Sequence, residues 1–239
     1  MYLDISALGP YALVILAGLF AHACFQLSVS MLTLINSHAI GAGKRHGVIL
    51  KLSVSYILGA LFSTIGLLAT VTYFFTSVIS IKPSSIAWIF VCALVFAVGW
   101  AVLLFYYRRG KGTQLWLPRS FVEFATSRAK KTKNAFESFS LGLTMVIAEL
   151  PFLIAPLVLA GAVLSSLPSL EQSIGLLAYA VAACAPLFII TVMVGGGHKI
   201  SSIQRWREDN KQFLQWTSGL TLILLAVYLF AINIWGQSA

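Results

Sequence analysis

Residues 141–156 read LGLTMVIAELPFLIAP, and they lie inside an unbroken apolar run over 139–163. A helix of this length, at 1.5 Å per residue, crosses a hydrocarbon core of about 30 Å. Glu149 lies close to the middle of the run, and Pro151 and Pro156 follow it. A carboxyl group at mid-depth in a membrane is costly, and proline removes a backbone donor from a helix. We therefore predict a membrane span that is interrupted near its centre at a functional position.

The rest of the chain repeats this apolar character. Hydrophobic residues make up 59% of it and charged residues 10%, whereas a soluble domain has roughly a quarter of its residues charged. This composition excludes a soluble globule, a disulfide scaffold and a disordered chain. We predict an all-α integral membrane protein with six transmembrane helices, over residues 10–36, 50–76, 86–107, 139–163, 173–195 and 214–235.

The basic residues predict the orientation of these spans. Of the 16 lysines and arginines, all but Lys82 fall in the connections 37–51, 108–138 and 196–213. Because basic loops stay in the cytoplasm, both termini are predicted to lie outside the cytoplasm. We expect the membrane to be the cytoplasmic membrane of a bacterium or an archaeon. The formal charge of +9 is thereby explained by topology, and we expect no nucleic-acid partner.

The basic connection over 108–138 divides the chain into two halves, 1–107 and 139–239, each with three spans. Since three is odd, the second half begins on the opposite side of the membrane, and related halves would form an inverted repeat. Gly18-Leu19 and Gly142-Leu143 occupy similar places in the first span of each half. We predict two inverted three-helix repeats with a site at the midplane between spans 1 and 4.

Within the basic connection, residues 119–131 have the pattern of a short helix with Phe121, Phe124 and Ala125 on one side. Such a helix fits the headgroup layer, with its cations near anionic lipid. The alternative is a solvated linker between the halves.

The candidate pathway residues are His22, Gln26, Glu149, Pro151 and Pro156. Glu149 is the only acidic residue inside a span, so we expect a cationic partner, a hydrogen bond or a water-filled cavity beside it. His22 lies near the midplane of span 1 and is its candidate partner in binding a cation or relaying protons. The alternative is that each side chain is simply hydrogen-bonded to a neighbouring helix. One histidine and one glutamate do not make a metal site, and we expect no cofactor.

The three cysteines, Cys24, Cys92 and Cys184, all lie inside predicted spans and form no C-x-x-C motif. Cys92 is most simply a small packing residue. Cys24, between His22 and Gln26, is either a redox-active thiol or a structural one.

Residues 141–156, together with LAYAVAACAPLF over 177–188 and AGLF over 17–20, resemble the transmembrane domain of the CcdA/DsbD family. That family passes reducing equivalents across the bacterial inner membrane and belongs to a broader group with LysE-like exporters. The resemblance implies the six-span fold. The redox cycle of the family needs one cysteine in span 1 and one after the proline of span 4. Here Phe152 follows Pro151, and Gln26 occupies the first cysteine position.

We therefore expect a secondary transporter or exporter of a small solute or ion, not an enzyme, with Glu149 and His22 binding or coupling protons. Its partners are then the lipid bilayer, the solute or ion, and protons. Two alternatives remain open. One is a thiol electron carrier that pairs Cys24 with a cysteine of a membrane or extracytoplasmic partner protein. The other is a non-catalytic membrane assembly subunit of the same fold.

Overall fold

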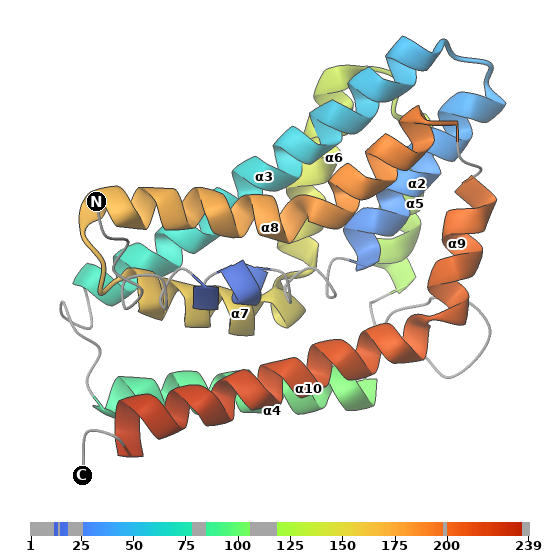
Figure 1. The fold of residues 1–239 in the computed structure, drawn as a ribbon. Coiled ribbons are helices and arrows are strands. Elements are labelled where there is room, and N and C mark those ends of the chain that lie inside the picture. The colour runs from blue at the N-terminus through green and yellow to red at the C-terminus, as the bar shows by residue number, and fades with distance from the viewer. Residues whose placement is uncertain are drawn as a thin grey trace.

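The computed structural model describes residues 12–13, 15–18, 26–77, 85–105, 119–197 and 200–235, and this part of the chain contains helices and short turns but no strand. Two short helical pieces, over residues 12–13 and 15–18, precede the longer helices, which are shown in Figure 1. They are α2 (Gln26–Gly41), α3 (His46–Ser77), α4 (Ser85–Phe105), α5 (Arg119–Lys131), α6 (Ala135–Ala148), α7 (Leu150–Leu164), α8 (Ser169–Gly195), α9 (Ile200–Asp209), α10 (Lys211–Phe230) and a π-helical turn (Ala231–Trp235).

Four of these helices are long and apolar enough to cross a membrane: α3, α4, α8, and α10 with the turn that follows it. Helices α6 and α7 also pass this test together, although they are bent by 79° relative to each other, so the described residues hold four or five candidate spans. The all-α membrane class is confirmed. The predicted span over 10–36 coincides in the described residues with the short apolar helix α2 and the pieces before it.

Two glycines bring α3 and α6 into very close contact. A Cβ atom added to Gly59 on α3 would collide with the carbonyl oxygen of Phe139, and one added to Gly142 on α6 would collide with the carbonyl oxygen of Tyr56. Small residues commonly allow such approaches between membrane helices. The crossing fixes Tyr56, whose side chain is fully buried, relative to α6.

Helices α4 and α10 form a second close pair, side by side along their length (Figure 1). Gly99 and Gly219 face each other in this pair. A Cβ added to Gly99 would lie 3.1 Å from the carbonyl oxygen of Gly219, and a Cβ added to Gly219 would lie 3.0 Å from the carbonyl oxygen of Gly99. The contact is therefore reciprocal between α4 and α10, the last long helix of each half.

The helical piece over residues 15–18 repeats the contact that α6 makes. A Cβ added to Gly18 would lie 2.9 Å from the carbonyl oxygen of Tyr179 on α8, as one on Gly142 would meet that of Tyr56 on α3. The two glycines are 124 positions apart and the two tyrosines 123. Helices α2 and α7 also begin 124 positions apart. The same kind of backbone contact thus occurs twice between the halves, at positions related by spacings of 123 and 124 residues.

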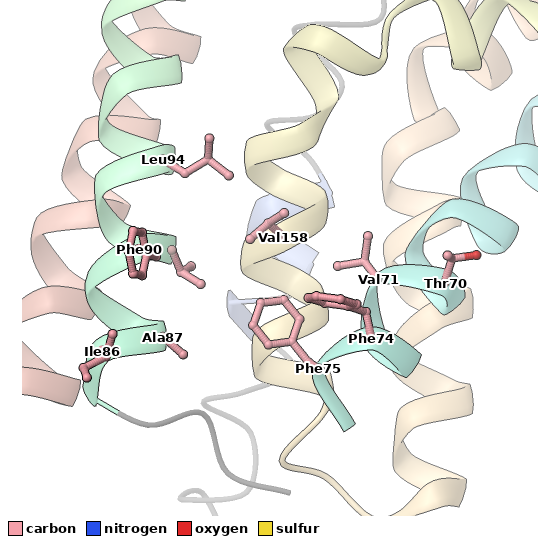
Figure 2. A pocket seen from close by; sticks show the side chains of 10 residues that line it. Thr70, Val71, Phe74, Phe75, Ile86, Ala87, Phe90, Leu94 and Val158 are labelled. Atoms are coloured by element: carbon pink, nitrogen blue, oxygen red, sulfur yellow. The ribbon is translucent and has the colours of Figure 1, made fainter. Parts of the chain in front are cut away.

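A groove of about 620 Å³ lies between α4 on one side and α3 and α7 on the other (Figure 2). Phe90 and Leu94 of α4 face Val158 of α7 across it, and Phe74 and Phe75 of α3 close one end. Its lining contains no titratable side chain, so the groove offers no candidate chemistry.

The helix predicted within the basic connection is confirmed as α5. Its inward face carries Ala125 and Ala129, both fully buried, where α5 packs against α2 and α6. Phe124, which was expected beside Ala125 on one apolar side, is instead 49% exposed. Alanine faces the protein because it permits close helix packing, while the aromatic ring is left at the surface.

Candidate functional site

The predicted interruption of the fourth apolar run is confirmed at Glu149, which stands between α6 and α7. Its backbone N–H donates to the carbonyl oxygen of Met145 at 3.1 Å, and its own carbonyl oxygen accepts from the N–H of Phe152 at 2.9 Å. Pro151 lies in the first turn of α7, where its missing N–H would have no intrahelical partner. Glu149 is therefore both the end of one helix and the start of the next.

The Glu149 carboxylate binds the N-terminal turn of α2. Its Oε1 atom accepts from the N–H of Leu27 at 2.5 Å and from the N–H of Ser28 at 3.1 Å, and its Oε2 accepts from the Ser28 hydroxyl at 2.8 Å. These N–H groups have no partner within their own helix, and the positive end of the helix favours an anion. With 1% of Glu149 exposed, one buried side chain joins α2 to the break between α6 and α7.

Three further helices complete the site. Tyr56 of α3 donates its hydroxyl to the carbonyl oxygen of Ser28 at 3.0 Å. Arg207 of α9, only 6% exposed, donates to the Ser30 hydroxyl at 3.2 Å, and its charge acts favourably on Glu149. Cys184 of α8 is fully buried near Thr64 of α3. Polar groups from α3, from α9 and from the break between α6 and α7 thus contact the first turns of α2.

A second group of buried polar atoms lies farther along α2. The Ser53 hydroxyl donates to Oδ1 of Asn36 at 2.8 Å, whereas Nδ2 of Asn36 and Oγ1 of Thr191 are buried without a partner. Buried polar groups that lack a protein partner usually bind ordered water. We therefore expect water at both atoms.

The antiparallel arrangement of α3 and α8 places this group at one depth. Gly195 lies against Leu50, and Cys184 against Thr64, so the two helices run in opposite directions. Thr191 then stands at nearly the same level as Ser53. The expected water sites consequently lie between α2, α3 and α8, on the side of Glu149 toward the end of α2.

The structure gives the five predicted pathway residues different places. His22 lies outside the described residues, as does Cys24, the predicted redox thiol, and Gln26 is the first residue of α2 with a side chain that is not described. Pro151 is exposed and Pro156 is buried. Helix α7 continues through Pro156, so the apolar run is interrupted at Glu149 and not at the second proline.

Sequence reasoning missed Ser28, Tyr56 and Arg207. The basic connection containing Arg207 was interpreted only as a marker of topology, yet Arg207 shares a buried face of α9 with Ile200 and Ile203. That spacing is the signal that was available. For Ser28 and Tyr56, no local pattern distinguishes them from other small or aromatic residues of a membrane helix.

No group of three or more histidine, cysteine, aspartate or glutamate side chains able to hold a metal ion occurs within the described residues. Cys92 and Cys184 are both buried free thiols, on α4 and α8.

Comparison of the chain with protein-family models, with curated proteins and with solved structures finds no match. The functional argument accordingly rests on the geometry of the site.

Proposed function

We propose that the protein is a secondary transporter of a small solute or ion, with its site at the contact between the start of α2 and the break between α6 and α7. The observation that carries the proposal is the buried Glu149 carboxylate, which accepts three hydrogen bonds from α2. Ionisable groups deep in a membrane commonly mark ion and proton pathways. Glu149 is the residue that couples transport to protons.

The recurring contacts between the halves support an inverted repeat. Gly18 meets the backbone of Tyr179 as Gly142 meets that of Tyr56, and Gly99 and Gly219 meet each other. A pseudo-two-fold axis relating the halves would produce both kinds of contact. In transporters built on such repeats, interrupted helices line a midplane site and the halves move relative to each other. We infer two three-span repeats with both termini outside the cytoplasm, the arrangement that the basic connections favour.

Protonation of Glu149 would weaken its hold on α2. In its ionised form the carboxylate accepts all three hydrogen bonds. Burial opposes this form, whereas the hydrogen bonds, the helix end and the charge of Arg207 favour it. A protonated carboxyl group carries no charge, and one of its oxygens becomes a donor. The contact between α2 and the break is then weaker, so proton binding and the opening of this contact are linked.

The buried polar side chains of Asn36 and Thr191 are the candidate access route for protons. Both residues lie toward the ends of α2 and α8 that the basic connections assign to the cytoplasm. A route along these side chains would connect that side of the membrane to the level of Glu149.

Proton-coupled currents in proteoliposomes test the proposal. We compare the wild type with Glu149→Gln and with the control Glu123→Gln, which changes an exposed carboxylate on α5. Each protein is tested with a panel of single amino acids and of monovalent and divalent cations at several pH values. We expect a current that depends on pH in the wild type and in Glu123→Gln, and loss of the pH dependence in Glu149→Gln. An unchanged pH profile in Glu149→Gln would contradict the coupling role.

The second candidate is a thiol carrier that pairs Cys24 with a cysteine of a partner protein, because thiol–disulfide exchange needs two thiols. Trapping with a thiol reagent in intact membranes distinguishes the two candidates. A mixed disulfide through Cys24 would indicate electron transfer as the function in place of transport, and an unreactive Cys24 would exclude the thiol carrier. A stable co-purifying protein together with an inactive, pH-independent wild type would instead indicate the assembly subunit.

A further inference from the structure

We propose that the cleft between α5 and the first turns of α6 binds one anionic phospholipid. The cleft has a volume of about 400 Å³, within the range of roughly 300–1,000 Å³ that is typical of small-molecule sites. Its lining combines two cations, exposed aromatic rings and hydroxyl groups, among them Arg128, Lys131, Phe124, Phe136, Ser140 and Thr144. This site is separate from Glu149 and does not depend on the transport proposal.

The cations of the cleft are available to a phosphate. Arg128 and Lys131 are three residues apart on α5, so they lie on the same side of the helix. The Arg128 guanidinium lies 5.5 Å from the centre of the Phe124 ring, a cation–π contact that leaves its N–H groups open to an acceptor. Both side chains are exposed.

The carboxylate that lines the same cleft is already engaged. Glu137 Oε2 accepts from the backbone N–H of Lys133 at 2.7 Å, and Oε1 accepts from the Asn134 side chain at 3.0 Å. In return, Asn134 caps the N–H of Glu137 at 2.9 Å. This reciprocal cap at the start of α6 directs the Glu137 oxygens toward the turn before the helix. The two cations therefore outnumber the one anion, and a phosphate at Arg128 and Lys131 restores the charge balance.

The apolar part of the cleft points to a lipid rather than a soluble anion. Phe136 is 78% exposed and Phe124 is 49% exposed. Exposing these rings is unfavourable in free energy when they face water but not when they face hydrocarbon. Leu141 and Thr144 continue the lining along α6, into the apolar run predicted as a span. Residues 136–144 cover about 12 Å of helix at 1.5 Å per residue, which accommodates a headgroup at one end and the first part of an acyl chain at the other.

Binding of phosphatidylglycerol to the purified full chain tests the proposal, with native mass spectrometry as the measurement and phosphatidylcholine as the neutral comparison. The variant Arg128→Gln/Lys131→Gln removes both cations. Its matched control, Lys130→Gln/Lys133→Gln, removes two charges from neighbouring residues that do not line the cleft. From the usual contribution of a basic residue near anionic lipid, we expect about 30-fold weaker phosphatidylglycerol binding in the first variant. The control should stay within about twofold of the wild type, since its side chains are outside the site.

A third variant separates lipid from free phosphate and keeps the test valid if the charge variant does not fold. Phe136→Ala removes an exposed ring and retains both cations, so it should weaken phosphatidylglycerol binding but leave binding of glycerol 3-phosphate unchanged. Equal binding of phosphatidylcholine, equal losses in both charge variants, or competition by glycerol 3-phosphate at the affinity of the lipid would each overturn the proposal.

Discussion

Replacing Gly142 by alanine should separate α6 from α3 and thereby disturb the site at Glu149. The new methyl group would collide with the carbonyl oxygen of Tyr56, and backbone cannot move aside as a flexible side chain can. Overpacking of a well-filled interior costs about 1–3 kcal/mol, occasionally more, against a gain of about 1 kcal/mol from the higher helix propensity of alanine. We expect a net loss of about 2 kcal/mol in the free energy of unfolding, because the collision involves backbone atoms.

The control for this substitution is Gly66→Ala on α3. Gly66 lies in the same type of apolar helix, but a Cβ there meets nothing within 4 Å. This variant should be neutral or more stable by about 0.4–1 kcal/mol. Denaturation in mixed detergent micelles, followed by circular dichroism, gives both free energies. If Gly142→Ala were as stable as Gly66→Ala, the close crossing of α3 and α6 would be wrong, and with it the argument that this crossing fixes Tyr56 relative to α6.

Three further substitutions test the contacts of the site and the start of α6. Glu149→Ala should destabilise the protein more than Glu149→Gln in the same denaturation assay, because it leaves the buried N–H groups of α2 without an acceptor at about 1–3 kcal/mol each; equal losses would refute this. Arg207→Gln should speed amide hydrogen exchange in α9 by tenfold or more, since a hydrogen bond from a charged group contributes about 1.5–3 kcal/mol, whereas the exposed Arg205→Gln should not. Asn134→Ala should cost about 1 kcal/mol through loss of the helix cap, and unchanged stability would contradict the cap.

The interruption at Glu149 was predictable from the sequence because its causes are local. An apolar run long enough to span a membrane, with a carboxyl group and a proline two residues apart, has few structural solutions. Helix α5 was predictable for the same reason, from its own periodicity. Pro156 shows the limit of this reasoning, because a proline inside a membrane helix is tolerated where surrounding groups satisfy the freed carbonyl, and sequence alone does not show the surroundings.

The contacts that complete the site were not predictable because they are distant in the chain. Glu149 meets Ser28 across 121 positions, and Arg207 meets Ser30 across 177. A serine that binds a carboxylate and one that packs against lipid have the same local sequence pattern. Arg207 was further obscured because its neighbours are charged, so the connection as a whole indicated only a cytoplasmic loop.

The pairing of Glu149 with the start of α2 explains how an apolar chain tolerates a carboxyl group at this depth. Without α2, the carboxylate would be a buried charge with no donor, and without the carboxylate, the first N–H groups of α2 would be buried with no acceptor. Each group removes the cost of the other, so partial contact leaves both unsatisfied and is disfavoured. The contact is therefore closer to all-or-none than a comparable apolar contact would be. A bistable contact whose strength depends on one proton is what a coupled gate requires, and this is the physical reason to place the gate of the proposed transporter at Glu149.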